Sequence, residues 1–207
     1  MAPEKDITKA IAYLKRFEFG AQPPAWLAPG MLAAELVETD TAEPGVRAPI
    51  RSFSHEAAVV YLVDQGEHYE WIDERDMERT GVDADTLHQI GIANLSRLVA
   101  ELRLVELHGV LTLRGLGMFE ASMVLCGPLW ESDTFVSRYG ATGAIVTMPS
   151  HDSLAICARG DDDALALLRK GQQTFASMED RSVPLCADLY ARTPDGQWLP
   201  YESQHSA

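Results

Sequence analysis

The chain has 207 residues, enough for one domain with a self-sufficient core, and its hydrophobic fraction of 46% and charged fraction of 23% are ordinary for a globular protein. This composition excludes a chain that is wholly disordered, collagenous or coiled-coil. Asp and Glu number 31 against 17 Lys and Arg, which gives a formal net charge of −14. Because nucleic acids and anionic membranes attract basic surfaces, we expect neither as a partner.

The sequence predicts a cytoplasmic protein. It contains no run of about 20 apolar residues, which a membrane-spanning helix requires. Its first 20 residues carry too many charges for a signal peptide. The three cysteines, Cys126, Cys157 and Cys186, form no CxxC motif. We expect them to be buried, reduced thiols.

Residues 1–43 are predicted to form an N-terminal helical segment and a linker. Ile7, Ile11 and Leu14 recur at helical spacing and predict a helix over residues 4–18. Residues 39–49 contain two prolines and a glycine, a composition typical of a linker. We therefore place a boundary between residues 43 and 44, and we expect residues 44–207 to form one domain.

The next segment predicts a hairpin followed by helices. The run AAVVYLVD at residues 57–64 favours a strand, and residues 68–72 favour its partner after the turn signal at residues 65–66. A helical turn over residues 73–80 ends at Gly81, and Asp83 or Asp85 caps a longer helix. That helix contains Gly91, which costs about 1 kcal/mol relative to alanine, so we expect another element to pack closely against it.

The rest of the chain is predicted to consist mainly of strands. Residues 105–113 alternate between apolar and polar, which predicts one strand with one buried face. Residues 119–126 are predicted to form a second strand that runs back beside it. Residues 144–158 and 185–201 favour hairpins, and the aspartates at residues 161–163 cap a helix between them. Many hairpins with few helices predict an α+β fold, with an antiparallel or mixed sheet and helices packed mainly on one face.

The segment from Asp64 to Asp85 carries nine acidic residues against two arginines, half of the net charge of the chain. A solvated face with helix-capping acids explains this segment without a function. The functional interpretation is a docking surface for a basic protein, with an association that salt weakens. Its residues would be Asp64, Glu67, Glu70, Asp73, Glu74, Asp76 and Glu78. The acids lack the spacing of an EF-hand, so no calcium loop is predicted.

Familiar catalytic and cofactor motifs are missing from the sequence. The glycines at residues 115 and 117 do not form a nucleotide-binding fingerprint, and the six histidines lack the spacing of a zinc site. We therefore predict no cofactor and no metal. The polar residues left as catalytic candidates are Asn94, Glu120, His151 and Asp152. His151 and Asp152 share a hairpin loop and resemble half of a general-base arrangement. Glu120 is expected to point outward, because an inward carboxylate would be costly.

Several short stretches follow one another in a recognisable order: APIRS at residues 48–52, VYLVD at 60–64, YEWID at 69–73, LHQ at 87–89, FEAS at 119–122 and MPSHDSL at 148–154. In this order, the chain from about Pro44 to Tyr201 resembles the YtpQ-like family of bacterial proteins, a domain of unknown function. The resemblance implies a cytoplasmic bacterial protein with an α+β domain, and it implies no activity, cofactor or catalytic residue. It singles out Asn94, Glu120 and Asp152 for testing.

Three functions from different classes follow as hypotheses. The first is a non-catalytic acidic module that docks a basic partner, for example an immunity or inhibitor protein that masks a basic toxin or nuclease. The alternative is a hydrolase-like enzyme with a pocket built from the four catalytic candidates. The third is an oligomer-forming role for an aromatic patch, and its residues would be Tyr61, Tyr69, Trp71, Trp130 and Trp198. The sequence leaves the oligomeric state open.

Overall fold

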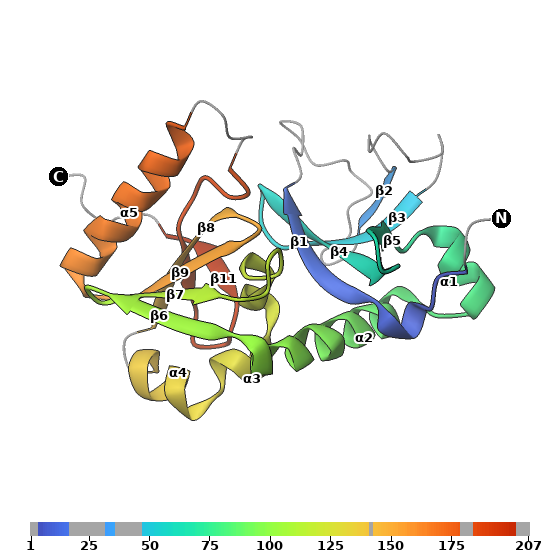
Figure 1. The fold of residues 1–207 in the computed structure, drawn as a ribbon, viewed down its shortest axis with the longest axis horizontal. Coiled ribbons are helices and arrows are strands. Elements are labelled where there is room, and N and C mark those ends of the chain that lie inside the picture. The colour runs from blue at the N-terminus through green and yellow to red at the C-terminus, as the bar shows by residue number, and fades with distance from the viewer. Residues whose placement is uncertain (1–3, 17–31, 36–46, 141–142, 179–183, 202–207) are drawn as a thin grey trace. The chain divides into compact units, whose positions relative to one another are not determined.

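A computed structural model describes residues 4–16, 32–35, 47–140, 143–178 and 184–201. The chain divides into two compact units, Met1–Arg97 and Leu98–Ala207. Each unit contains an antiparallel sheet and helices (Figure 1). The predicted α+β fold with antiparallel strands is therefore confirmed. The division between the units falls at residues 97 and 98, whereas the sequence placed a boundary at residues 43 and 44.

The sheet of the first unit is built around one buried central strand. Its strands are β1 (Ile11–Arg16), β2 (Leu32–Glu35), β3 (Arg47–Ser52), β4 (Ala57–Asp64) and β5 (Tyr69–Trp71). They follow the order β1-β4-β3-β2, and β5 also pairs with β4. All pairings are antiparallel, and every residue of β4 except Asp64 is buried. The predicted strand at residues 57–64 and its hairpin partner are confirmed.

The helix predicted over residues 4–18 is wrong. Asp6 caps a 3₁₀ turn, η1 (Ile7–Lys9), and the backbone then becomes extended and enters β1. Ala12, Tyr13 and Leu14 are buried one after another in that strand. Side chains of a strand with two buried faces form a continuous apolar run, which periodicity alone does not distinguish from a helix. Because β1 pairs with β4 along its whole length, this segment belongs to the first unit.

Two helices follow the first sheet as predicted. Asp73 caps α1 (Glu74–Thr80), which ends at Gly81 in the left-handed conformation with φ 67°. Asp83 accepts a 2.7 Å hydrogen bond from the backbone of Thr86 at the start of α2 (Ala84–Arg97). A Cβ atom on Gly91 would lie 3.0 Å from the backbone nitrogen of Ala12 and 3.0 Å from the Tyr61 ring. The predicted close approach to Gly91 is therefore confirmed.

The second unit contains a six-stranded antiparallel sheet in the order β11-β10-β8-β9-β7-β6. Its strands are β6 (Arg103–Leu107), β7 (Val110–Arg114), β8 (Ala144–Ser150), β9 (Ser153–Ala158), β10 (Tyr190–Arg192) and β11 (Trp198–Pro200). Its helices are η2 (Leu98–Glu101), η3 (Ala121–Leu125), α3 (Gly127–Trp130), α4 (Asp133–Tyr139) and α5 (Asp162–Ala176). The hairpins predicted at residues 144–158 and 185–201 are present as β8–β9 and β10–β11.

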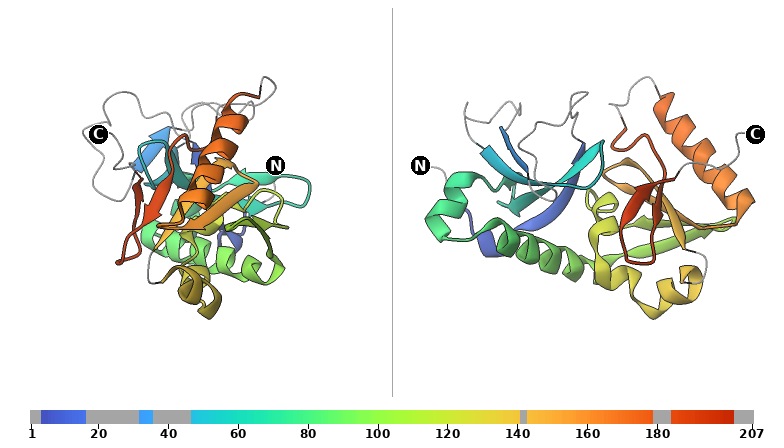
Figure 2. Two further views of the ribbon diagram at one scale, coloured as in Figure 1. Left: turned by 90° about the vertical axis from the view of Figure 1, so that its left-hand side faces the viewer. Right: turned by 180° about the vertical axis from the view of Figure 1, so that it is seen from behind.

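Helices lie on both sides of this second sheet, whereas the sequence predicted them mainly on one side. α5 packs on one side through a buried cluster that includes Val110, Ile145, Cys157, Leu165 and Leu168. Figures 1 and 2 show α3 and α4 on the opposite side of the sheet from α5. The predicted cap of α5 is confirmed, since Asp161 accepts a 3.0 Å hydrogen bond from the backbone of Ala164. No helix in the described ranges is long and apolar enough to cross a membrane.

Two predicted strands of this unit are wrong. Residues 105–113 contain the two strands β6 and β7, which are joined at His108 and Gly109 with φ values of 49° and 77°. A two-residue turn with two positive φ angles matches the right-handed twist of a hairpin. Residues 119–126 form a buried 3₁₀ helix, η3, and its flanks instead of a strand. A short run that is buried all round carries no periodic signal that separates the two structures.

Candidate functional site

Two of the seven acids proposed for docking are used inside the fold. The ammonium of Lys5 lies 2.8 Å from the carboxylate of Asp76 and 3.4 Å from that of Asp73. Arg79 pairs with Asp76 as well, at 3.3 Å, and Asp73 and Asp76 form the capping box of α1. Burial alone would raise the pKa of Asp76, but hydrogen bonds from Lys5 and the Asp73 backbone outweigh it and lower that pKa. These two carboxylates hold the N-terminal segment against α1.

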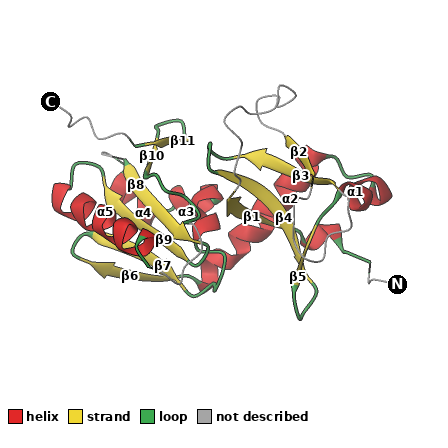
Figure 3. Cartoon of the chain, turned by 90° about the horizontal axis from the view of Figure 1, so that it is seen from above, coloured by secondary structure: helices red, strands yellow, loops and turns green. Residues whose placement is uncertain are grey.

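Of the other acids in this segment, some are paired, and the unpaired docking candidates lie at two separate places. Glu70 lies 3.0 Å from the ring nitrogen of His68, and Asp85, in the same acidic segment, pairs with Arg51. The remaining docking candidates are exposed and form no ion pair with a residue of the described ranges: Asp64, Glu67, Glu74 and Glu78. The first two lie at the β4–β5 turn and the other two on α1, which Figure 3 shows at different places of the first unit.

The side chain of Asn94 is fully used in holding the first unit together. Its amide nitrogen donates to the carbonyl oxygens of Thr8 and Ala10, at 2.9 and 2.8 Å. Its amide oxygen accepts a 2.9 Å hydrogen bond from Arg97. Asn94 therefore anchors the start of β1 to α2. The other three catalytic candidates belong to the second unit.

Glu120 points inward, contrary to our expectation. The residue is 3% exposed, and one carboxylate oxygen accepts hydrogen bonds from the backbones of Leu116 and Gly117 at 2.9 and 3.1 Å. The other oxygen is buried and has no hydrogen-bond partner in the part of the chain that the structure describes. The hydrogen bonds of Glu120 stabilise the loop that precedes η3.

His151 and Asp152 form the turn between β8 and β9. The backbone of Ala121 donates a 3.0 Å hydrogen bond to the carbonyl oxygen of His151, which places this turn beside η3. The exposed carboxylate of Asp152 accepts from the Ser150 hydroxyl, and its backbone oxygen accepts from Arg114 at 3.3 Å. The contacts of Asp152 are therefore local to the turn and its neighbouring strand.

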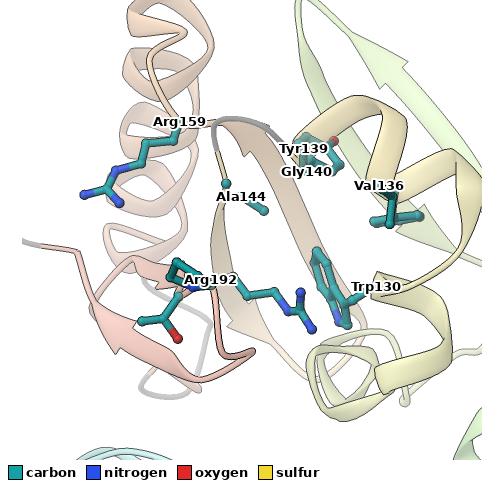
Figure 4. A pocket seen from close by; sticks show the side chains of 11 residues that line it. Trp130, Val136, Tyr139, Gly140, Ala144, Arg159 and Arg192 are labelled. Carbon is teal, nitrogen blue, oxygen red and sulfur yellow. The ribbon is translucent and has the colours of Figure 1, made fainter.

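A pocket of about 230 Å³ lies in the second unit, where α3, α4 and β10 meet the start of β8 and the end of β9 (Figure 4). Its apolar wall comes from the helices and includes Trp130, Phe135 and Tyr139. Two arginines, Arg159 from the segment after β9 and Arg192 from β10, also line it. None of the described residues that line this pocket is acidic. In a chain with 31 acids, the pocket is thus a local region of positive charge.

Arg192 is the polar group that reaches furthest into the pocket. Its guanidinium extends from β10 toward Trp130, and its central carbon lies 6.0 Å from the centroid of that ring (Figure 4). The Nε atom is buried without a hydrogen-bond partner, and the guanidinium pairs with no carboxylate of the described segments. A Cβ atom on Gly196 would lie 3.2 Å from this guanidinium, so the glycine leaves room for it.

Trp130 forms a rigid side of the pocket. Its indole nitrogen donates a 3.0 Å hydrogen bond to the carbonyl oxygen of Met123. Edge-to-face contacts with Phe135 and Trp198 hold the ring, with centroids 5.2 and 4.8 Å away. Such aromatic contacts fix orientation as well as burying apolar surface. The pocket therefore presents a flat apolar surface that is already in place.

The hydroxyl of Tyr139 is a second unpartnered polar group of the pocket. The residue is 4% exposed, and no described residue forms a hydrogen bond with this oxygen. Burial raises the pKa of Tyr139 to about 12, although the positive charge of Arg138 and a weak polar contact of its side chain with the hydroxyl act in the opposite direction. The hydroxyl stays protonated at neutral pH and is available as a hydrogen-bond donor.

Arg159 stands at the rim of the pocket. Figure 4 shows its guanidinium turned away from Trp130, and its central carbon lies 5.9 Å from the centroid of the Tyr201 ring. It pairs with no carboxylate of the described residues. Arg159 therefore contributes to the local charge without reaching the aromatic wall.

The second unit also has a larger and more apolar groove, of about 490 Å³, between α5 and the sheet. Leu107, Ala155, Leu168 and Phe175 contribute to its lining. The buried hydroxyl of Thr147 lines the groove and has no hydrogen-bond partner among the described residues. One uncharged hydroxyl specifies a ligand less sharply than the arginine, tyrosine and tryptophan of the smaller pocket.

Known proteins give no further guide to this site. The chain matches no protein-family model, and no curated protein or solved structure is significantly similar to it. The resemblance to the YtpQ-like family therefore stays a prediction, and the site is interpreted from its own geometry.

Cys157 is poorly suited to act as a nucleophile. All three cysteines are buried thiols that form no disulfide, as predicted. Burial raises the pKa of the Cys157 thiol to about 11, and the negative charge of Asp161 adds to this shift. A thiol with such a pKa is almost entirely protonated at neutral pH, whereas a catalytic cysteine acts as its thiolate.

Sequence reasoning missed the residues of the pocket. Trp130 was considered only as part of an aromatic patch, and Tyr139, Arg159 and Arg192 were not singled out. These residues are spread over more than sixty positions of the sequence and belong to no motif. The one local signal is the turn sequence Pro194-Asp195-Gly196 directly after Arg192, which predicts that a hairpin holds this arginine near its end.

Proposed function

We propose that this chain is a binding protein for a small organic anion with a planar ring, and that it holds this molecule in the Arg192 pocket. One observation carries the proposal: the buried Nε atom of Arg192 and the buried hydroxyl of Tyr139 have no hydrogen-bond partner among the described residues, and both residues line the same cavity as Trp130. Buried polar groups are nearly always hydrogen-bonded in proteins. Two such groups that lack a hydrogen-bond partner in one cavity therefore indicate that a bound molecule supplies it.

The charge of the pocket favours an anion. Arginine matches the planar geometry of carboxylates and phosphates, and its charge-assisted hydrogen bonds are about twice as strong as neutral ones. At this end the pocket offers two donors, the guanidinium, which has no acceptor atom, and the Tyr139 hydroxyl, which is protonated at neutral pH. A cation would meet no acidic group among the described lining residues.

The size of the pocket favours a single ring. A cavity of about 150 Å³ is large enough for benzene. The volume of about 230 Å³ leaves room for one further group, such as a carboxylate. Trp130 and Phe135 supply the aromatic surface against which such a ring packs.

The same groups favour binding over catalysis. General acid–base catalysis works best with a group whose pKa lies near the working pH. Tyr139, with a pKa of about 12, and an arginine, which does not lose its proton in proteins, are both far from that range. The hydrolase-like alternative gains no support from Asn94, because its amide is bound within the first unit.

Calorimetric titration of the full chain with benzoate tests the proposal. We expect saturable binding to the natural chain, and we expect Arg192→Gln to weaken it about tenfold or more, because a hydrogen bond to a charged group contributes about 1.5–3 kcal/mol. The matched control is Arg103→Gln, an exposed arginine outside the pocket that loses the same charge. Binding of benzoate by this control should equal that of the natural chain.

Two related probes separate the ring from the charge. Benzyl alcohol has the ring without the charge, and phosphate has the charge without the ring, so both should bind more weakly than benzoate. Equal loss of benzoate binding in Arg192→Gln and Arg103→Gln would show that net charge alone is responsible. That result, or absence of benzoate binding to the natural chain, would contradict the proposal.

We propose, as a second function, docking of a basic protein through exposed carboxylates of the first unit. The observation in its favour is that Asp64, Glu67, Glu74 and Glu78 are exposed without an ion-pair partner in the described ranges. An immunity or inhibitor role for a basic toxin is one form of this function. The resemblance to the YtpQ-like family neither adds to it nor opposes it.

Charge reversal on α1 tests the docking function. Glu74→Lys combined with Glu78→Lys should slow association with poly-lysine at low salt, because electrostatic steering acts mainly on the association rate. Asp162→Lys combined with Asp163→Lys on α5 makes the same change in net charge and should have a smaller effect. If both double variants slow association equally, net charge is sufficient and the docking surface is contradicted.

A further inference from the structure

The edge strand β6 is the most exposed apolar segment that the structure describes in the second unit. It lies at the end of the six-stranded sheet, with β7 as its only neighbour in the described strand order (Figure 1). All five of its residues are exposed. Leu104, Val105 and Leu107 are exposed by 44%, 53% and 61%. Because successive side chains of a strand point to opposite faces, apolar groups project on both sides of this edge.

Natural edge strands are usually protected against pairing with other strands. Charged side chains, prolines, bulges or a covering segment supply this protection. In β6 the acid Glu106 is held by Arg138 of α4, with a 2.8 Å contact in a two-pronged ion pair. This pairing lowers the pKa of Glu106 and directs its charge toward α4. Arg103 at the beginning of the strand is the only other charge in it.

The hairpin geometry shows which backbone groups of β6 are available. β6 and β7 are joined by the two-residue turn His108–Gly109, which closes on the pair Leu107 and Val110. In an antiparallel ladder, hydrogen-bonded and non-hydrogen-bonded pairs alternate. If the closing pair is hydrogen-bonded, as such turns require, Val105 also bonds to β7. The backbone groups of Leu104 and Glu106 then point away from the sheet.

We propose that β6 pairs with β6 of a second copy of this chain, antiparallel and about a twofold axis at Val105. Leu104 then lies opposite Glu106 of the second copy, and their free backbone groups form hydrogen bonds in both directions. The two sheets become one continuous sheet. A twofold axis uses the same surface on both copies, so one self-complementary edge is sufficient.

Charge supports a second copy at this edge more than at other faces. The chain carries −14 in total, whereas the hairpin from Arg103 to Arg114 contains Glu106 and two arginines, a net charge of +1 with neutral histidine. Two copies that meet here avoid bringing acidic surfaces together. In the proposed register the two Arg103 side chains lie at opposite ends of the paired strands, so no like charges face each other.

Salt dependence distinguishes this association from docking of a basic partner. Two chains of the same net charge repel each other over long range, and salt screens that repulsion. Salt does not screen the apolar contacts and backbone hydrogen bonds of the paired strands. We therefore expect the dimer to become more stable as salt increases, whereas an acidic–basic complex becomes weaker.

Sedimentation velocity of the full chain over a range of protein and NaCl concentrations tests the proposal. We expect a dimer, and we expect Val105→Lys to raise its dissociation constant at least tenfold, because two ammonium groups would then face each other at the axis. The matched control is Val136→Lys on α4, which is exposed by 51% and lies outside β6. This control should leave the dissociation constant within about twofold of that of the natural chain.

A crosslinking variant keeps the test independent of the lysine variants. Val105→Cys places two thiols at a non-hydrogen-bonded pair, where Cα atoms are about 4.5 Å apart and a disulfide can form. The native cysteines are buried and do not compete. We expect a crosslinked dimer from Val105→Cys under mild oxidation and none from Leu107→Cys, which lies opposite Arg103 of the second copy. A monomer at all concentrations, equal weakening by Val136→Lys, or the reverse crosslinking pattern would overturn the proposal.

Discussion

Asp76→Ala is expected to lower the free energy of unfolding by about 3 kcal/mol, since removal of one partner of a buried ion pair costs about 3–5 kcal/mol. Asp76 is 8% exposed and receives Lys5, Arg79 and the backbone of Asp73. Without it, Lys5 keeps, among the described residues, the Trp71 carbonyl oxygen at 2.7 Å and the more distant Asp73. Urea unfolding at neutral pH measures the loss.

The acid dependence of this contribution has a definite sign. The pKa of Asp76 is lower in the folded protein than its ordinary value of 3.8. Its contribution to stability is therefore complete above the ordinary value and disappears as the pH falls through the lower, folded value. The difference in stability between the natural chain and Asp76→Ala should be constant near neutral pH and should shrink only at strongly acidic pH.

Two further variants show whether the ion pair itself is responsible. Glu78→Ala removes an exposed carboxylate from the same helix and should change stability by less than about 0.5 kcal/mol. Lys5→Met combined with Asp76→Ala should cost less than the two single changes together, because neither charge is then left without its partner. A fully additive result would show that Lys5 and Asp76 act separately, which would refute this account.

Trp130→Ala is expected to have an effect of similar or larger size, about 3–5 kcal/mol, on the stability of the second unit. Trp130 is 4% exposed, packs between Phe135 and Trp198, and bonds to Met123 through its indole nitrogen. Alanine leaves a cavity where the wall of the pocket stood and removes both aromatic contacts. Urea unfolding gives the stability change, and benzoate titration of the folded variant should show no binding.

Conservative and distant replacements serve as controls for Trp130. Trp130→Phe keeps much of the apolar volume and should lose less stability than Trp130→Ala, although the hydrogen bond to Met123 disappears. Val136→Ala truncates an exposed side chain that also lines the pocket and should cost little. A loss below 1 kcal/mol in Trp130→Ala would mean that the neighbouring rings close the gap, and the description of a rigid wall would then be wrong.

Elements with strong local signals were predicted well. The run AAVVYLVD with the following turn signal is β4 and the start of its hairpin with β5. Asp73 at the start and Gly81 at the end delimit α1, and the aspartate at residue 161 caps α5. These signals depend on backbone conformation and on hydrogen bonds within a few residues, so the local sequence is sufficient to determine where these elements begin and end.

Elements whose environment comes from distant segments were not predicted. The residues of β1 form a strand because β4 supplies its hydrogen bonds and α2 packs at Ala12, neither of which is visible from residues 4–18. The 3₁₀ helix η3 is buried on all sides, so its apolar run has no period. The inward position of Glu120 follows from the amides of Leu116 and Gly117, which the loop turns toward it.

Charge shows the same difference between the sequence and the fold. Nine acids between Asp64 and Asp85 predicted one anionic surface, but basic side chains from other segments neutralise part of its charge. Lys5 neutralises part of it from the N-terminal segment, and Arg51 pairs with Asp85 from β3. Conversely, the arginines of the pocket belong to no basic run of the sequence, and Arg159 even precedes the aspartates at residues 161–163, so only the fold leaves them without carboxylate partners in the described ranges.

The sequence by itself determined the α+β class, the main hairpins and the caps of the helices, because each depends on the preference of a few neighbouring residues for one backbone conformation. Tertiary structure alone decided which side chains are left without partners. Arg192, Tyr139 and the edge of β6 acquire their character from groups that are distant in the chain, since hydrogen bonding, charge pairing and strand pairing are properties of neighbours in space.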